Sequence, residues 1–291
     1  MPPYQRISHS WVARYPGARG VVAFYGGEFF GRFPTFFYGY FLNCLYNAGY
    51  TLIVVPVQSG LDHARIAVLL LEERDAVRAA LPELNRLPHF WVGHSVGGEI
   101  IALLEAWTDP TTNRFRPPGL PLSVEHCGVR DEMALLMAPD IADTAQAIPI
   151  PPLAWLLDWL GLGVKPTKPQ MKRVISTQDL HTPTALISFH DDTVAGNESE
   201  SPAVSDVAWF IQTYNAPHPE LFLHQEMAGG HLEPIAFYIG RWVFQFSLRH
   251  CNITSDLPRP LEPLAIEYLR QLGGIVDVRR AERHEAQQGL A

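Results

Sequence analysis

The stretch Phe90–Trp91–Val92–Gly93–His94–Ser95–Val96–Gly97–Gly98 joins a short apolar run to the pattern Gly-x-Ser-x-Gly, and a helix-like run follows it. This order is the sequence form of a nucleophile elbow, a sharp strand-to-helix turn that exposes one serine above an α/β sheet. Ser95 is therefore the candidate nucleophile, and the backbone N–H of Val96 is a candidate donor to an oxyanion. The alternative is a glycine-rich turn without chemistry. An elbow also predicts an acid and then a histidine further along the chain, and an oxyanion turn before it.

Apolar runs alternate with helical patterns along the rest of the chain, which is typical of βαβ units and a mostly parallel sheet. We therefore expect one α/β domain over residues 1–291, with helices on both faces of the sheet. The tail, 274–291, is charged and without periodicity, so we predict that it is flexible. The predicted strands are 20–25, 51–56, 90–92, 134–137, 184–189 and 221–227, and the predicted helices include 34–48, 62–81, 99–107 and 234–248.

One segment, 141–180, interrupts this alternation and is a candidate cap. It contains the Pro-rich run 148–152 and then the apolar stretch Leu153–Leu162, which includes Trp155 and Trp159. This stretch is either a lid that lines an acyl pocket and makes transient contact with a membrane, or a helix packed on the edge of the sheet. Trp155 and Trp159 are candidate substrate-binding residues on the first interpretation.

The acid of a hydrolytic triad should follow a late strand, and two aspartates compete for that place. The predicted strand 184–189 is followed by His190–Asp191–Asp192–Thr193–Val194–Ala195. The run Asp-Thr-Val-Ala after the strand favours Asp192 as the acid. A spacing of three residues between the acid and the apolar Val194 favours Asp191 instead. The other aspartate would cap the turn.

The histidine should come last, on a loop after the final strand. Ala228–Gly229–Gly230–His231–Leu232 fits this place, and His231 would take the proton of Ser95 while the acid holds its other ring nitrogen. His224 and His190 are the alternatives. His94 lies beside the serine, and its side chain should point away from the serine hydroxyl and pack behind the elbow.

The turn after the first buried strand, Tyr25–Gly26–Gly27–Glu28–Phe29–Phe30–Gly31, is the candidate for the rest of the oxyanion hole. We expect the N–H of Gly27, together with that of Glu28, to meet the oxyanion. Phe29 and Phe30 begin an aromatic run that would line an apolar acyl site. A Glu28 carboxylate aimed into the hole would oppose an anion, so its side chain should point away.

Composition excludes several classes of function. The chain has 291 residues and a net charge of −8, without a Lys/Arg cluster for a nucleic acid. We expect no secretory signal and no transmembrane segment, and hence a cytoplasmic protein. The three cysteines lack metal-type spacing, and no cluster of ligands is convincing, so neither a metal nor a cofactor is predicted.

Taken together, the oxyanion turn, Gly93–Ser95–Gly97, Asp191–Asp192–Thr193 and Gly230–His231–Leu232 resemble the α/β-hydrolase superfamily. The first third of the chain looks closer still to an uncharacterised family of cyanobacterial and plastid α/β-hydrolase-like proteins. The resemblance covers about residues 15–250. It implies the α/β-hydrolase fold, and it implies no substrate.

The leading hypothesis is a serine hydrolase of carboxylic esters, acting on a small-molecule or lipid ester with an apolar acyl group. A non-catalytic binding protein on the same fold is the competing class, because a fold does not determine a function. A third hypothesis keeps the triad and transfers the acyl group to an acceptor other than water.

Overall fold

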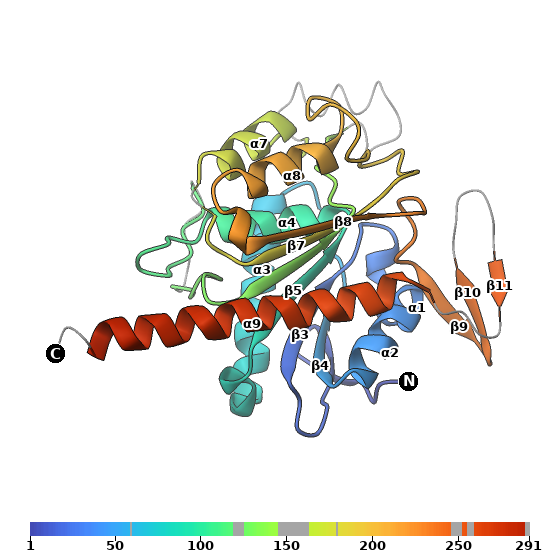
Figure 1. Cartoon of the computed structure of the whole chain (residues 1–291). Helices are drawn as coiled ribbons and strands as arrows, with labels where there is room; N and C mark the ends of the chain where they lie inside the picture. The colour runs from blue at the N-terminus through green and yellow to red at the C-terminus, as the bar shows by residue number, and fades with distance from the viewer. Residues whose placement is uncertain are drawn as a thin grey trace.

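The computed structural model describes residues 1–58, 60–118, 125–144, 163–178, 180–245, 252–254 and 259–288. Its secondary structure follows the predicted alternation of strands and helices (Figure 1). In chain order the elements are β1 (Gln5–Ile7), β2 (Ser10–Ala13), β3 (Gly20–Tyr25), η1 (Phe30–Arg32), α1 (Pro34–Phe37), α2 (Gly39–Asn47), β4 (Tyr50–Val55), α3 (His63–Ala80), η2 (Pro82–Arg86), β5 (His89–His94), α4 (Val96–Ala106), β6 (Met133–Met137), α7 (Lys168–Ser176), β7 (Thr184–Phe189), α8 (Asp206–Asn215), η3 (Pro219–Leu221), β8 (Phe222–Met227), β9 (Ala236–Ile239), β10 (Trp242–Gln245), β11 (Asn252–Thr254) and α9 (Leu261–Gln288).

A central sheet of eight strands organises the molecule, in the order β1-β2-β4-β3-β5-β6-β7-β8. The six strands from β4 to β8 along this order are parallel, and β1 and β2 join one edge as antiparallel strands. Every residue of β3, β4, β5, β6 and β7 is buried, as expected for parallel strands covered on both faces. The prediction of a mostly parallel sheet is confirmed.

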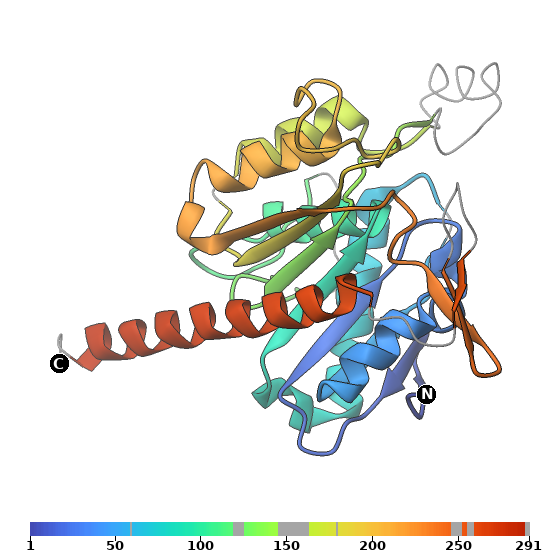
Figure 2. The ribbon, with the colours of Figure 1, turned by 45° about the vertical axis from the view of Figure 1, so that its right-hand side comes forward.

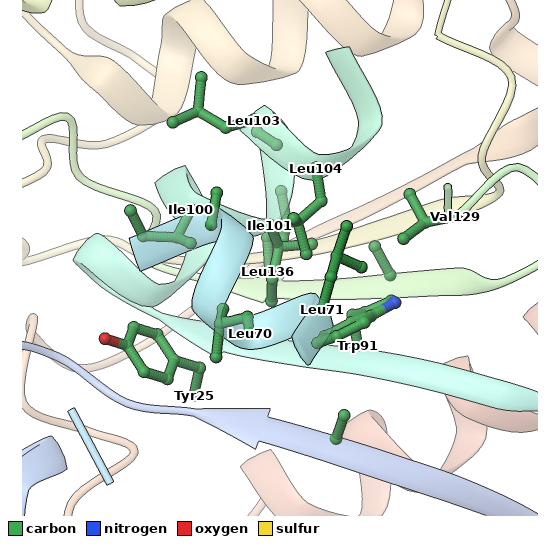
Figure 3. Packing of buried hydrophobic residues seen from close by; sticks show 14 of the residues in the cluster. Tyr25, Leu70, Leu71, Trp91, Ile100, Ile101, Leu103, Leu104, Val129 and Leu136 are labelled. Carbon is green, nitrogen blue, oxygen red and sulfur yellow. The ribbon is translucent and has the colours of Figure 1, made fainter. Parts of the chain in front are cut away.

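Two apolar layers cover the sheet, one on each face. On one face, side chains of α3, α4, α7 and α8 pack on alternate residues of the strands, and Figure 3 shows the part around Trp91 and Leu136. On the other face, α2 and α9 pack on the remaining residues. Figure 2 shows the long red helix α9 crossing the sheet opposite the yellow and orange helices α7 and α8.

Two predicted segments differ from the structure. The single helix predicted over 34–48 is two helices, because Tyr38 leaves the helical conformation (φ −103°, ψ 18°) and its side chain is buried. The helix predicted over 234–248 is wrong. Strands β9 and β10 form a hairpin there, with Gly240 at a φ of 61° in the turn.

The hairpin sequence Ala-Phe-Tyr-Ile-Gly-Arg-Trp-Val-Phe-Gln contains aromatic and β-branched residues, which favour strands over a helix. The hairpin lies against α1 and α2, where Phe36 contacts Phe237 with 4.8 Å between ring centroids. In the tail, α9 continues to Gln288, and the flexibility expected of residues 274–291 stays a prediction.

The candidate cap is described only at its two ends. The predicted lid helix Leu153–Leu162, with Trp155 and Trp159, lies outside the described residues. At the C-terminal end of the candidate cap, α7 packs against α4 and contributes the buried residues Met171 and Ile175 to the core. That part of the segment therefore belongs to the layer that covers the sheet.

Candidate active site

Ser95 lies at the junction of β5 and α4, in a backbone conformation that few residues with a side chain adopt. Its φ is 58° and its ψ is −128°, as a nucleophile elbow requires. The flanking glycines are required by sterics. A Cβ on Gly97 would lie 2.1 Å from the carbonyl oxygen of Tyr25, and one on Gly93 would lie 2.6 Å from the carbonyl carbon of Gly97. The turn forms because strand and helix can pass this close to each other.

A chain of hydrogen bonds joins three of the predicted site residues. Ser95 Oγ lies 2.8 Å from His231 Nε2, and His231 Nδ1 lies 2.9 Å from Asp192 Oδ2. All three residues are buried, with exposed fractions of 8% for Ser95, 6% for His231 and 2% for Asp192. The loops after β5, β7 and β8 bring them together at the carboxyl ends of neighbouring parallel strands.

The two competing aspartates occupy different surroundings. Asp192 Oδ1 accepts hydrogen bonds from the N–H groups of Val194 (2.8 Å) and Ala195 (3.0 Å), which leaves Oδ2 for the histidine. Asp191 is exposed, and its backbone N–H donates to the carbonyl of Gly229. The geometry therefore favours Asp192 over Asp191.

The alternative histidines lie elsewhere. His190 pairs with Glu226 on the exposed side of β8, and His224 contacts Ser188. His94 points behind the elbow, as predicted. Its Nε2 lies 2.8 Å from the carbonyl oxygen of His231, and its Nδ1 lies 2.8 Å from the hydroxyl of Tyr38.

The protonation of His94 follows from these partners. Burial, with a smaller effect of nearby His231, lowers the pKa of His94 to about 3, so the ring is neutral and carries one N–H. The carbonyl of His231 can only accept, so that hydrogen is on Nε2. Tyr38 therefore donates its hydroxyl hydrogen to Nδ1. The Tyr38 oxygen in turn accepts from the N–H of Gly27 at 3.0 Å.

This network corrects one prediction about the oxyanion hole. The N–H of Gly27 is directed at Tyr38 and is not available to an oxyanion. Among the described residues, no acceptor is recorded for the N–H groups of Glu28 and Val96, which both belong to the wall of the cavity beside Ser95. These two amides are the remaining candidate donors. Nothing in the local sequence distinguished Tyr38 from the other aromatic residues of its run.

The site opens into a cavity of about 280 Å³. Among the residues that line it, Phe29, Phe30, Val194 and Leu232 are apolar, and Phe29 is 71% exposed at the surface. Glu28 also lines it. Burial raises the pKa of the Glu28 carboxyl, against the smaller effects of His63 and Arg32, which reduces the negative charge beside the site.

His63 and Glu99 form a buried pair behind this wall, between α3 and α4. His63 Nδ1 lies 2.7 Å from Glu99 Oε1, and the N–H of Ala142 donates to Glu99 Oε2. Burial alone would lower the pKa of His63, but the Glu99 carboxylate raises it. The neighbouring Asp62 caps α3 by accepting from the N–H of Arg65.

Two properties of the described residues bear on possible ligands. No group of three or more His, Cys, Asp or Glu side chains in them is arranged to hold a metal ion. No helix within the described ranges combines the length and the apolar character needed to cross a membrane.

Comparison with known proteins relates this architecture to others. Residues 3–113 match a family described as "Protein of unknown function (DUF1350)". No curated protein matches the sequence. Among solved structures, an esterase from Pyrococcus furiosus is 12% identical with a TM-score of 0.56, and the match covers 94% of this chain and 91% of that one.

A second esterase, inhibited esterase B from Lactobacillus rhamnosis, is also 12% identical, with a TM-score of 0.52, and the match covers 94% of this chain and 84% of that one. At such identity the likeness establishes the fold. The parallel sheet, the elbow at its centre and the likeness to these two esterase structures together show that the chain has the α/β-hydrolase fold.

Proposed function

We propose that this protein is a serine hydrolase that cleaves carboxylic esters through an acyl-enzyme. The observation that carries the proposal is the buried relay from Ser95 Oγ through His231 to Asp192, with distances of 2.8 and 2.9 Å, at the wall of a cavity. A nucleophile, a base and a group that orients the base are the arrangement that acyl transfer requires.

In this mechanism Ser95 attacks the ester carbonyl while His231 Nε2 takes its proton. The N–H groups of Glu28 and Val96 stabilise the oxyanion of the tetrahedral intermediate. His231 then donates the proton to the leaving alcohol, and Asp192 stabilises the imidazolium. Water, activated by the same histidine, releases the acid from Ser95.

The apolar part of the cavity supports an ester with an apolar acyl group, in contact with Phe29 and Phe30. The segment that carries Trp155 and Trp159 is predicted from the sequence to contact substrate or membrane. A cytoplasmic location likewise stays a prediction from the sequence. A p-nitrophenyl ester series from acetate to octanoate ranks the acyl length. Activity that peaks at acetate and vanishes at octanoate would contradict the apolar assignment.

A fluorophosphonate probe tests the nucleophile directly. We expect the wild type to be labelled, Ser95→Ala to be unlabelled, and Ser176→Ala, which changes an exposed serine, to be labelled like the wild type. Absence of labelling in a folded wild-type sample would favour the non-catalytic binding protein. Acyl transfer to an alcohol in preference to water would favour the transferase.

A further inference from the structure

Five large apolar side chains are exposed to solvent in two segments beside the cavity, 29–37 and 236–245. They are Phe29, Phe33, Phe36, Ile239 and Trp242. Their exposed fractions range from 41% for Trp242 to 71% for Phe29. Exposed apolar groups that gather on one side of a molecule mark a site of interaction. We call these five residues the apolar surface.

Contacts between aromatic rings join the two segments to each other and to the cavity. Phe30, which lines the cavity, contacts Phe37 with 5.0 Å between ring centroids, and Phe37 contacts Phe237 of β9 at 5.8 Å. Phe36 also contacts Phe237, at 4.8 Å. Figure 1 shows α1 beside the orange hairpin of β9 and β10, in agreement with these contacts. The apolar surface is therefore continuous with the candidate active site.

Strand alternation determines which side of the hairpin is exposed. Val243 is buried, and the hydroxyl of Tyr238 accepts a hydrogen bond from Asn43 of α2, so these two hairpin side chains point toward the body of the molecule. Successive side chains of a strand point to opposite faces. Ile239 and Trp242, which are paired across the hairpin, therefore point away from α2, one on either side of the turn.

The charged groups of the two segments are positive. The segments contain no Asp or Glu, and their two arginines, Arg32 and Arg241, are both exposed. The guanidinium carbon of Arg241 lies 5.2 Å from the centroid of the Trp242 ring. The preceding acid, Glu28, is half-buried in the wall of the cavity. Because the whole chain has a net charge of −8, this local excess of cations sets the apolar surface apart and suits an anionic partner.

The size of the apolar surface distinguishes a lipid partner from a protein partner. A stable protein interface uses about 20–30 residues on each side, far more than five side chains provide. Peripheral contact with a bilayer needs apolar groups that enter the boundary of the acyl chains and cations that reach the headgroups. Phenylalanine, isoleucine and tryptophan side chains beside two arginines supply both.

We propose that the apolar surface docks the protein on an anionic phospholipid bilayer. Docking goes beyond the proposed hydrolysis and does not depend on it. In the docked protein Phe29, which belongs both to the apolar surface and to the wall of the cavity, contacts the lipid, so the cavity lies at the bilayer surface.

Co-sedimentation with vesicles tests the docking. The vesicles consist of ether-linked phospholipids, which contain no carboxylic ester, either as pure phosphatidylcholine or as an equal mixture with the anionic phosphatidylglycerol. At physiological salt we expect the wild type to bind the mixed vesicles more tightly than the neutral ones. A folded wild type that stays in the supernatant with both kinds of vesicle would overturn the proposal.

Substitutions within the apolar surface test which residues make the contact. Phe33→Ser and Trp242→Ser should each lower the partition coefficient on mixed vesicles about tenfold, through lost burial of one apolar side chain. Val204→Ser is the control, because Val204 is also exposed but precedes α8, which covers the other face of the sheet. Circular dichroism verifies folding. Unchanged binding of the two folded variants, or an equal loss in Val204→Ser, would overturn the proposal.

A change of charge tests the preference for anionic lipid. Arg241→Gln should bind mixed vesicles about fivefold more weakly and neutral vesicles as the wild type does, since a cation near an anionic bilayer contributes about this factor. Arg114→Gln, which changes an exposed arginine outside both segments, should match the wild type on both. Equal binding of Arg241→Gln and the wild type to mixed vesicles would contradict the role of charge.

Lipids with brominated acyl chains locate the contact, because bromine quenches the fluorescence of nearby tryptophans. The measurement uses Ser95→Ala, which should dock as the wild type does, so that docking is measured without hydrolysis and can succeed or fail separately from it. Adding Trp242→Phe keeps an apolar ring, so binding should persist while quenching decreases. Quenching that stays undiminished would place the bilayer on another part of the chain and overturn the proposal.

A second copy of the chain is the competing occupant. Analytical ultracentrifugation should show the same state of association for the wild type and Trp242→Ser. A dimer that Trp242→Ser dissociates, in a protein that binds neither kind of vesicle, would assign the apolar surface to a second copy and overturn the proposal.

Discussion

At the scale of single residues, the site depends on which polar atoms are already paired. Asp192 holds His231 with one oxygen because the N–H groups of Val194 and Ala195 occupy the other. The Tyr38 hydroxyl accepts a hydrogen bond from the N–H of Gly27 and donates one to His94. The oxyanion turn, the elbow and the histidine loop therefore share one hydrogen-bond network. Each bond restricts where a neighbouring group can point.

Replacing each of the two aspartates in turn tests which one is the triad acid. Asp192→Asn should lower kcat for an ester by about 10⁴-fold, because the amide favours the wrong tautomer of His231. Asp191→Asn, the matched change of an exposed neighbour, should leave kcat within about twofold. A large loss in Asp191→Asn with a mild effect of Asp192→Asn would reverse the assignment.

Tyr38→Phe removes the acceptor of Gly27 N–H and the donor to His94 in one step. The unsatisfied buried amide should lower the free energy of unfolding by about 1–3 kcal/mol. We expect kcat to fall about tenfold with KM unchanged, since the displaced groups position His231 and the oxyanion turn. Urea unfolding and steady-state kinetics measure the two effects. Tyr46→Phe on the adjoining helix α2, which loses only an exposed hydrogen bond to the carbonyl of Arg14, is the control.

At the scale of elements, a buried acid joins α4, α8 and β7. Glu105 Oε2 accepts from the hydroxyl of Tyr214 at 2.8 Å, and Oε1 lies 3.3 Å from Thr184 Oγ1. The Thr184 hydroxyl lies within hydrogen-bond distance of both Glu105 Oε1 and the carbonyl of Thr182 and can donate its one hydrogen to either. Burial raises the pKa of Glu105 to about 8, against the smaller effects of the hydrogen bonds from Tyr214 and Thr184.

This acid makes stability depend on pH. Between its ordinary pKa of 4.5 and about 8, the folded chain keeps the Glu105 proton while the unfolded chain loses it. The stabilisation is therefore complete below pH 4.5 and declines as the pH rises to 8. Glu105→Gln, whose side chain is neutral at every pH, should remove this decline, on the order of 4 kcal/mol.

Urea unfolding of both proteins from pH 5 to 9 measures the difference. Glu125→Gln, at an exposed position, should follow the wild-type curve. A wild-type curve without this decline would show that Glu105 is ionised in the folded protein at neutral pH.

At the scale of the whole molecule, helices close both faces of the sheet, and α9 contributes much of the second layer. Leu261, Ala265, Leu269 and Leu272 of α9 are fully buried against this face. The layer also contains Tyr38, the residue that precedes α2, and so the second face of the sheet also supports the active site.

Leu269→Ala should lower the free energy of unfolding by about 2–5 kcal/mol, through lost burial and the cavity that remains. Gln271→Ala, on the exposed side of the same helix, should change it by less than about 0.5 kcal/mol. Denaturation in urea measures both. A small effect of Leu269→Ala would mean that α9 is dispensable to the layer.

The sequence by itself determined the local elements whose residue types are compatible with only one kind of packing. Gly93 and Gly97 admit the close approach of strand and helix, and the continuous apolar runs 20–25 and 184–189 suit strands buried on both faces. Periodicity alone does not separate the hairpin of β9 and β10 from a helix, because these short apolar segments suit either element until contact with α1 and α2 buries one side.

Only the tertiary structure decided which polar atoms pair with one another through hydrogen bonds. Ser95 and His231 are 136 residues apart, and the choice of Asp192 over Asp191 depends on which carboxyl the packed loop turns toward the histidine. The hydrogen bond between His94 and the carbonyl of His231, and the pairing of His63 with Glu99, likewise join segments distant in sequence. Hydrogen bonds form over about 3 Å, and distances of that size between remote segments are determined by the packing of the whole core.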